Sequence, residues 1–269
     1  MKILLIGAGN MGLSYARSFI ENHVTDTNNL IILEKEKGDR IAHLKSLNIG
    51  TIETNVECVK NADLIILAVK PQDANALFAN IKSYVSHDQV ILSIMAGITI
   101  QSIKDNLSID KVVRAMPNIA SKIGSGMTAF YASEEVTRIE ISMIQNLLAA
   151  TGKTLNLEKE ETLNATTAIS GSGPAYVYFF MDSIIKVAEK LGLSKSEANL
   201  LVKQTFLGAI ELFQQNSISC QEWIDVISSK GGTTEAAIEK FIQESLSEKI
   251  FLGIEAAKLR ADELGMKIN

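Results

Sequence analysis

A glycine-rich turn directly behind a short apolar run is the first candidate for chemistry in this chain. Residues 7–12 read G-A-G-N-M-G, follow the apolar residues 3–6, and precede a helix-like stretch. In such a turn the first glycine permits a sharp bend, the second admits a pyrophosphate, and the third lets the helix pack close to the strand. Helix N–H groups and the helix dipole favour a phosphate there. The pattern predicts a Rossmann-type dinucleotide site, and the alternative is a glycine turn that binds nothing.

Charged residues after the second apolar run bear on the choice of coenzyme. Glu34 ends that run, where an acidic side chain binds the ribose of NADH and repels the 2′-phosphate of NADPH. Lys35, Lys37 and Arg40 follow at once and offer cations to that same phosphate. The sequence therefore predicts NADPH, NADH or both as cofactor and does not rank them.

Two further polar residues follow predicted strands. Pro71 disfavours a helix at Lys70, so Lys70 stays extended at the carboxyl edge of the sheet, where open α/β sheets bind ligands. Lys70 is predicted to hold a ring, a carboxamide or an anion, and the alternative is a lysine that faces solvent. Asn118 ends the segment R-A-M-P-N at the same edge. It is either a hydrogen-bonding ligand or a turn residue after proline.

The second half of the chain carries two glycine-rich interruptions. Residues 170–174 read S-G-S-G-P inside a helical stretch, at a propensity cost of a few kcal/mol. Such a break suggests that the backbone approaches the nicotinamide end of a coenzyme or another domain, unless it is a simple turn between helices.

The second interruption, residues 228–234, reads S-S-K-G-G-T-T before a helical run. Backbone N–H groups and hydroxyls there are suited to a carboxylate. Alternatively, Thr233 or Thr234 is merely an N-cap.

The elements that must position these residues change in type near residue 158. Before it, Ile-, Val- and Leu-rich runs alternate with helical patterns, as in a sheet buried on both faces. The predicted strands are 2–6, 30–34, 63–69, 89–94, 111–115 and 126–131. The predicted helices between them are 11–22, 39–46, 73–85 and 134–150. We therefore predict an α/β N-terminal Rossmann-type domain, residues 1–157, with a mostly parallel sheet.

From residue 158 to 269 the chain reads as all-α. The predicted helices are 160–191, 195–215, 220–227, 235–244 and 247–264. Ser194 with Glu197 three residues later forms a capping-box pattern. The apolar content is generous for a small helical domain, which suggests dimerisation, and the loop at residues 228–234 adds substrate binding to the predicted role of this domain. The alternative is that the apolar stripes pack only on one another.

Composition narrows the function classes. The 269 residues are 46% hydrophobic and 21% charged, with a formal charge of −5, which argues against a nucleic-acid partner. No apolar stretch approaches the roughly 18–20 residues of a membrane helix, so no membrane association is expected. Cys58 and Cys220 lie far apart without metal-ligand spacing, and we interpret both as reduced thiols of a cytoplasmic protein. No metal site is predicted.

The order and separation of the motifs are more specific than any one of them. G-A-G-N-M-G, A-V-K-P, R-A-M-P-N, S-G-S-G-P-A-Y and S-K-G-G-T-T follow one another over nearly the whole chain. This pattern resembles the pyrroline-5-carboxylate reductase family. The resemblance implies NAD(P)H-dependent reduction of L-1-pyrroline-5-carboxylate to L-proline, the last step of proline biosynthesis. It also implies a Rossmann domain and a helical domain that dimerises by interlocking, with dimers that assemble further, five of them forming a decamer.

The resemblance also completes the predicted site. The residues predicted to bind the coenzyme are Gly7, Ala8, Gly9, Asn10, Met11, Gly12, Glu34, Lys35, Asn55, Ala68, Val69, Lys70, Pro71, Ala96, Gly97 and Asn118. The residues predicted to bind the substrate are Ser172, Ser229, Gly231, Gly232, Thr233 and Thr234. The resemblance implies that the partner subunit donates the loop around residues 229–234. Lys230 stands where many members have proline, which we expect to alter loop stiffness more than chemistry.

Thr234 and Lys70 are the predicted catalytic residues. Thr234 matches the threonine that contacts the ring nitrogen, and it is expected to orient that nitrogen or help protonate it. Catalysis then rests on placing two rings face to face, and no nucleophile is required. Three alternatives remain: a reductase of another cyclic imine, a 3-hydroxyacid-type dehydrogenase of similar architecture, and a non-catalytic coenzyme-sensing paralogue.

Overall fold

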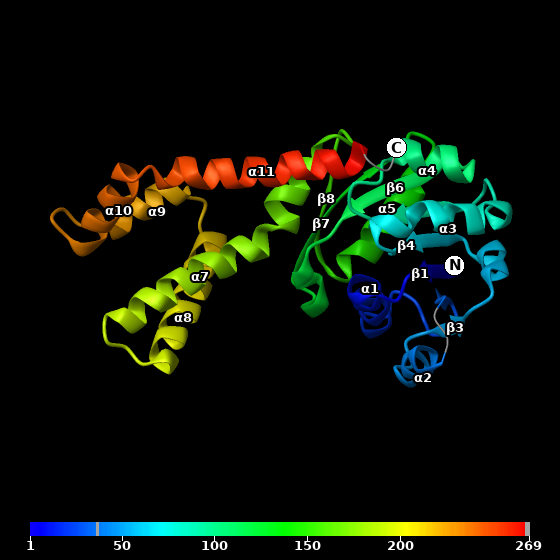
Figure 1. Cartoon of the computed structure of the whole chain (residues 1–269), viewed down its shortest axis with the longest axis horizontal. Coiled ribbons are helices and arrows are strands. Elements are labelled where there is room, and N and C mark those ends of the chain that lie inside the picture. The colour runs from blue at the N-terminus through cyan, green and yellow to red at the C-terminus, as the bar shows by residue number, and fades with distance from the viewer. Residues whose placement is uncertain (36–37, 267–269) are drawn as a thin grey trace. The chain divides into compact units, whose positions relative to one another are not determined.

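The chain divides into two compact units in a computed structural model that describes residues 1–35 and 38–266 (Figure 1). The first unit contains Met1–Pro174 together with the C-terminal segment that starts at Ala256, and the second contains Ala175–Glu255. The boundary predicted at residue 158 separates a coenzyme-binding domain from a dimerisation and substrate-binding domain rather than two compact units, and it stays a prediction. Lys37, one of the cations considered for the 2′-phosphate, lies outside the described residues.

The first unit is built on one twisted sheet. Within the described residues its strands run in the order β3-β2-β1-β4-β5-β6-β7-β8. Every neighbouring pair is parallel except β6 with β7, which confirms the predicted, mostly parallel Rossmann-type sheet. The strands are β1 (Ile3–Ile6), β2 (Leu30–Leu33), β3 (Thr51–Glu53), β4 (Leu64–Leu67), β5 (Val90–Ser93), β6 (Val112–Met116), β7 (Gly126–Ala132) and β8 (Gly152–Asn156).

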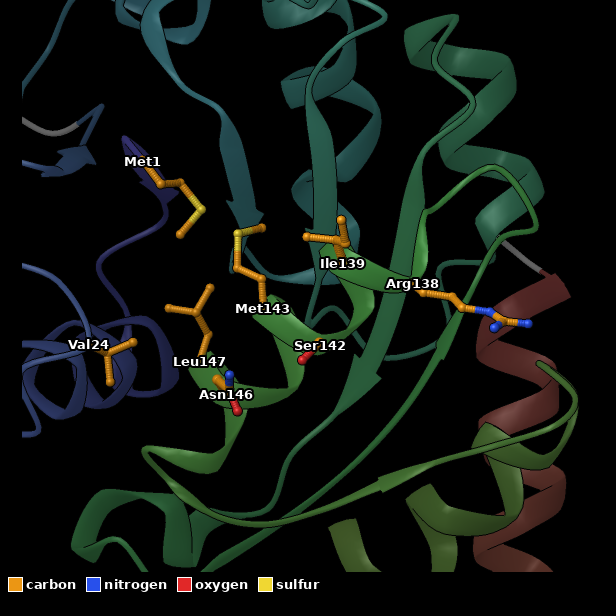
Figure 2. Close-up of a pocket in the computed structure, with 8 residues that line it drawn as sticks. All are labelled: Met1, Val24, Arg138, Ile139, Ser142, Met143, Asn146 and Leu147. Carbon is orange, nitrogen blue, oxygen red and sulfur yellow. The ribbon is translucent and has the colours of Figure 1, made fainter.

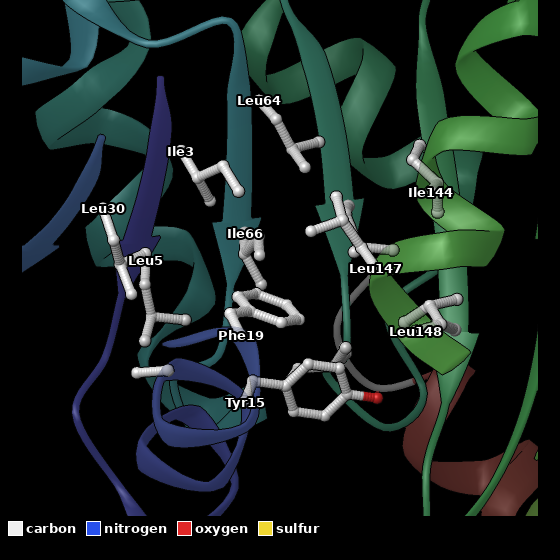
Figure 3. Close-up of a cluster of buried hydrophobic side chains, with 14 of the residues drawn as sticks. Ile3, Leu5, Tyr15, Phe19, Leu30, Leu64, Ile66, Ile144, Leu147 and Leu148 are labelled. Atoms are coloured by element: carbon white, nitrogen blue, oxygen red, sulfur yellow. The ribbon is translucent and has the colours of Figure 1, made fainter. Parts of the chain in front are cut away.

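Helices cover both faces of this sheet because its central strands carry apolar residues on both sides. Alternate residues of β1 enter different clusters, with Leu5 on one face and Leu4 on the other. On the first face, α1 (Asn10–Glu21) contributes Phe19, beside α5 (Arg138–Ala149) (Figure 3). On the second face lie α3 (Ala74–Ile81) and α4 (Ile100–Leu107). With helices packed on both of its faces, the sheet holds the carboxyl ends of its parallel strands together at one edge.

Three elements of this unit were missed by the sequence prediction. The edge strands β3 and β8 are short and rich in polar residues, so they lack the apolar run that marks a buried strand. The helix α4 is only eight residues long, although Thr99 caps its first turn. The lack of an apolar run explains the two omitted strands, whereas length does not explain the omission of α4. The helix α2 (Asp39–Ser46), which also has eight residues, is as predicted.

The remaining helices confirm an all-α second half, with a break near its start. They are α6 (Thr162–Thr166), the π-helical turn η5 (Thr167–Gly171), α7 (Gly173–Lys190), α8 (Lys195–Gln215), α9 (Cys220–Ile227), α10 (Thr233–Gln243) and α11 (Leu246–Met266). The predicted capping box is present, since Ser194 and Glu197 bond each other's backbone N–H groups at the start of α8.

The second unit does not enclose a core of its own. Ala198 and Val202 are its buried apolar residues, whereas large side chains such as Phe179 and Ile242 are 69% and 70% exposed. Among the described residues, no helix is both long enough and apolar enough to cross a membrane.

Candidate functional site

The glycine-rich loop between β1 and α1 is shaped by close backbone approach. Gly7 has a φ of +106°, and a Cβ on it would lie 2.8 Å from the carbonyl carbon of Ala68. A Cβ on Gly12 would collide with the carbonyl oxygen of Gly7. By contrast, no described atom lies within 4 Å of a Cβ built on Gly9, and α1 begins there without a side-chain cap. Packing thus requires glycine at positions 7 and 12, whereas Gly9 leaves open space in front of the N–H groups that begin α1.

An acid and a cation meet at the end of β2. Glu34 follows the strand and is 9% exposed. Arg40, on α2, places its Nε 3.8 Å from a carboxylate oxygen of Glu34. The Arg40 guanidinium also donates a hydrogen bond to the carbonyl oxygen of Ala8 in the glycine-rich loop. Arg40 therefore links the residue predicted to bind the ribose with the loop predicted to bind the pyrophosphate, while Lys35 is exposed.

The ends of β4 and β5 bring two more predicted segments to the same edge. After β4, Lys70 is exposed and extended (φ −68°, ψ 144°), as predicted from the proline behind it. After β5, Ala96 is half-buried and Gly97 is buried with a φ of +79°. Because β1 lies beside β4, and β4 beside β5, these segments adjoin the glycine-rich loop.

The side chains of Asn55 and Asn118 make hydrogen bonds within the protein that the sequence did not predict. The Asn55 side chain accepts a hydrogen bond from the N–H of Glu57 and caps the short helix η1 (Val56–Asn61). Asn118 accepts from the N–H groups of Ala120 and Met127, and its amide donates to Ser170 Oγ. The side-chain oxygens of both residues are therefore engaged within the protein, and coenzyme binding by either stays a prediction.

At the S-G-S-G-P break the backbone comes close to another segment of the same unit, whereas an approach to a coenzyme or another domain stays a prediction. A Cβ on Gly171 would lie 2.9 Å from the Met116 side chain at the end of β6. Ser172, the predicted substrate ligand, follows the π-helical turn, and its N–H donates to the carbonyl of Thr167. The Asn118–Ser170 hydrogen bond joins the same two segments. The break thus packs against the R-A-M-P-N segment of the first unit.

In the second unit, the S-K-G-G-T-T loop forms a tight turn before α10. The N–H of Gly232 donates to the carbonyl of Ser229, and Gly231 has a φ of +73°. Gly232 is the N-cap of α10, so neither Thr233 nor Thr234 serves as the cap. Among the described residues, the two threonine hydroxyls have no hydrogen-bond partner, and Thr234 is half-buried. The N–H groups of Gly231 and Gly232 donate to Glu235 and Ser229. Among the described residues, the donors left unused in this loop are therefore the two hydroxyls and the first N–H groups of α10.

The sequence reasoning missed a polar cluster around Arg114 of β6. Arg114 is 5% exposed, and its guanidinium pairs with Glu160 at 2.9 Å and donates to Asn164 at 2.9 Å. Asn164 in turn donates to Asp262 of α11 at 2.9 Å. An arginine inside a strand predicted to be buried on both faces was the available signal, because a buried guanidinium requires partners.

A surface cavity of 540 Å³ lies apart from all of these residues (Figure 2). It is lined by Met1, Val24, Arg138, Ile139, Ser142, Met143, Asn146 and Leu147. Met1 precedes β1, whereas the glycine-rich loop follows it, so the cavity belongs to the opposite edge of the sheet. Among the described residues, no cluster of histidine, cysteine and acidic side chains is suited to a metal ion.

Two family models match the chain. Residues 160–264 match the model of pyrroline-5-carboxylate reductase dimerisation. Residues 2–97 match a model described as NADP oxidoreductase coenzyme F420-dependent. The first match covers the helices that leave apolar side chains exposed, and the second covers the glycine-rich loop.

Relatives match over almost the full length. Pyrroline-5-carboxylate reductase 2 of Bacillus subtilis is 33% identical over 98% of this chain and 95% of its own length. The structure of a pyrroline-5-carboxylate reductase from Coxiella burnetii is 31% identical, with a TM-score of 0.89 and 98% of each chain covered. The Plasmodium falciparum enzyme, solved with NADP bound, is 28% identical with a TM-score of 0.88 over 98% of each chain.

Proposed function

Since the chain belongs to the pyrroline-5-carboxylate reductase family, we infer that it reduces L-1-pyrroline-5-carboxylate to L-proline with NADPH or NADH. The observation that supports this inference most directly is the 33% identity, over 98% of the chain, to pyrroline-5-carboxylate reductase 2 of Bacillus subtilis. The motifs for coenzyme and substrate are both present and in order. The chain is therefore an oxidoreductase of proline biosynthesis.

The glycine-rich loop fits a dinucleotide. Gly9 leaves open space at the first turn of α1, where backbone N–H groups meet the positive end of the helix dipole. We assign the pyrophosphate to residues 7–12 and the nicotinamide end to Ala96, Gly97 and the segment 68–71. When bound, the coenzyme supplies the hydride, and the protein supplies orientation. Lys70, exposed at this edge, is assigned to hold the carboxamide or an anionic group there.

We assign the substrate to the loop residues Ser229, Gly231, Gly232, Thr233 and Thr234, and also to Ser172. Backbone N–H groups at the start of α10 suit the carboxylate of the imine. The Thr234 hydroxyl is unpaired among the described side chains and is assigned to the ring nitrogen. It orients that nitrogen and helps to protonate it, which makes the adjacent carbon more electrophilic. The loop acts in the site of the partner subunit, so catalysis requires the dimer.

Turnover with two imines tests the reaction. Loss of the reduced coenzyme's near-ultraviolet absorbance is followed with L-1-pyrroline-5-carboxylate and with its six-membered analogue. We expect kcat/KM to be higher with the five-membered ring. A higher value with the six-membered ring assigns the chain to another imine, and no turnover with either ring favours a non-catalytic role.

Variants at Thr234 test its role separately from binding of the carboxylate. Thr234→Ala removes the hydroxyl and is expected to lower kcat by about 10²-fold, the lower end for a lost proton-transfer group. Thr234→Ser keeps the hydroxyl and serves as the matched control, with near-normal kcat. Unchanged catalytic efficiency in Thr234→Ala removes this role from the residue.

Coenzyme choice rests on the Glu34–Arg40 pair. Glu34 suits the ribose hydroxyls of NADH, and Arg40 can turn from Glu34 to a 2′-phosphate. We propose that both coenzymes are accepted, and that Arg40→Leu lowers kcat/KM for NADPH more than for NADH. Rates with each coenzyme at matched concentration test this, and complete inactivity of the wild type with one coenzyme contradicts it.

The assembly is at least a dimer, because residues 160–264 match a dimerisation model. We propose five dimers in a decamer, and light scattering during gel filtration measures that mass.

We also propose a cytoplasmic location, supported by two free cysteines, Cys58 and Cys220, that lie in different units.

A further inference from the structure

The polar cluster around Arg114 connects three segments that are distant in sequence. Glu160 Oε1 receives the Arg114 guanidinium at 2.9 Å, and Asn164 Oδ1 receives its other nitrogen at 2.9 Å. The Asn164 amide then donates to Asp262 Oδ1 at 2.9 Å. Arg114, Asn164 and Asp262 are thus joined by a continuous chain of hydrogen bonds from β6 to α11. All of these residues belong to the first unit.

Both ends of this cluster reach the turn that follows β5. At one end, Glu160 Oε1 also accepts the N–H of Ile100, the first residue of α4, at 2.9 Å. At the other end, Asp262 lies one turn of α11 before Gly265. A Cβ on Gly265 would lie 3.1 Å from the carbonyl oxygen of Gly97. One buried arginine is therefore linked to both sides of residues 97–100.

The side chains hold these positions with charge as well as shape. Lys258 Nζ lies 2.7 Å from Asp262 Oδ2, and it is the main cause that keeps the pKa of Asp262 below its ordinary value. Asp262 thus stays ionised and accepts from Asn164 and Lys258 at the same time. Glu160 sits at the N-terminus of α4, where the helix dipole favours a negative charge.

We propose that Arg114, Glu160, Asn164 and Asp262 form a clamp that positions the Ala96–Gly97 turn for the coenzyme. Because a Cβ on Gly265 would lie only 3.1 Å from the carbonyl oxygen of buried Gly97, the last turn of α11 limits where that carbonyl can lie. The four residues are positioning residues, since they act on the coenzyme through the turn. The inference rests on the proposed function for the assignment of Ala96 and Gly97 to the nicotinamide end.

Variants on α11 test the clamp without emptying the buried site of Arg114. Asp262→Ala removes the contact to Asn164, and Gly265→Ala adds a methyl group at 3.1 Å from the Gly97 oxygen. Each is made in the full-length dimer, and the dissociation constant for NADPH is measured directly by coenzyme fluorescence. We expect affinity to fall by about tenfold in each variant, since small displacements at a site have large effects.

The same helix offers matched controls. Glu263→Ala removes the neighbouring acid, whose one ion-pair partner among the described residues is exposed Arg260. Gly253→Ala adds the same methyl group where no described atom lies within 4 Å. Both are expected to bind NADPH like the wild type. Asp262→Asn keeps an oxygen for the Asn164 amide, so it is expected to restore most of the affinity.

The outcomes separate the clamp from a general loss of structure. Weaker NADPH binding with an unchanged oligomeric mass supports the clamp. Wild-type affinity in both Asp262→Ala and Gly265→Ala overturns it, and so does a loss of NADPH affinity that is accompanied by dissociation of the dimer. Because binding is measured without the imine, failure of the reductase assay leaves this test standing and rejects the proposed reaction alone.

Discussion

The two compact units differ in where they bury apolar side chains. The first encloses two clusters, one on each face of its sheet, with Phe19 and Phe78 almost fully buried. The second exposes apolar side chains on each of its helices. These are Val177, Tyr178, Phe179, Ile184, Val187, Leu191, Leu193, Leu200, Leu201, Leu207, Ile210, Leu212, Phe213, Val226, Ile227, Phe241, Ile242, Ile250, Phe251 and Leu252.

This difference shows that one unit is complete as a single chain and the other is not. Exposed apolar patches of this extent mark a surface that is covered by another molecule. The match to a dimerisation model over residues 160–264 identifies the cover as a second copy. The predicted alternative, in which the helical stripes pack only on one another, is therefore wrong. The stability of the second unit must depend on protein concentration.

The largest expected effect is dissociation by a charge in the second unit. Phe179→Asp replaces an apolar side chain that is 69% exposed in the single chain. Its loss removes roughly 1.5–3 kcal/mol of burial per subunit, twice in a symmetric dimer, so the dimer dissociation constant should rise by at least about 10²-fold. Light scattering measures the mass. The control is Ile139→Asp in the first unit, which is 83% exposed and should leave the mass unchanged.

A core deletion sharpens the comparison through concentration dependence. Phe19→Ala empties a fully buried position in the first unit and should lower the free energy of unfolding by about 3–5 kcal/mol. Its Tm deficit should be similar at low and high protein concentration. For Phe179→Ala the deficit should shrink as concentration rises. Thermal unfolding at two concentrations measures both, and a concentration-independent loss in Phe179→Ala would place that side chain in a core.

Acid sensitivity should differ between the capping boxes of the two units. The Ser194 hydroxyl, followed by its N–H, holds the pKa of Glu197 below its ordinary value. A carboxyl with a lowered folded pKa stabilises the fold above its unfolded pKa of about 4.3, and this stability is lost as pH falls through the folded value. Ser194→Ala should therefore flatten the loss of stability below about pH 4.3. Urea unfolding at several pH values measures the slope.

The corresponding box in the first unit provides the control. Burial opposes ionisation of Glu140, but Lys111 and the N–H of Thr137 outweigh it and keep its pKa below the ordinary value. Because Lys111 lies 2.8 Å away and remains in Thr137→Ala, the acid slope should change less than in Ser194→Ala. Equal changes in the two variants would show that Lys111 contributes little.

The smallest effect concerns the two thiols. Burial, helped by the charge of Glu53, raises the pKa of Cys58 in the first unit to about 11, so only about one molecule in a thousand carries its thiolate at pH 8. Cys220 in the second unit is exposed. A chromogenic disulfide at pH 8 should modify Cys220 first and Cys58 only slowly, and equal rates would contradict the burial of Cys58.

Features written in local sequence could be predicted. The glycine spacing at residues 7–12 depends on backbone sterics within one turn, and its packing reasons are visible at Gly7 and Gly12. Long apolar runs likewise identified the central strands, with ends displaced by one or two residues. In α4, Thr99 as cap with Ile100, Ile103 and Leu107 at helical spacing was a usable signal that was passed over.

Features that depend on distant partners could not be predicted from one sequence. Arg114 stands out in an apolar strand, but its partners Glu160 and Asn164 lie 46 and 50 positions away. The sequence predicts Asn118 as either a ligand or a turn residue, and only its contact with Ser170, 52 positions away, shows that it joins two segments.

The return of the final helix to the first unit has a consequence for synthesis. Asp262 and Asn164, which bond each other, are separated by 98 positions, and the whole second unit lies between them. A ribosome therefore releases all the helices of that unit before the sheet can receive its last helical segment. In a nascent chain, the exposed apolar surface of the second unit is therefore available to a second copy before the last helical segment completes the first unit. Pairing of two chains can thus precede firm binding of the coenzyme.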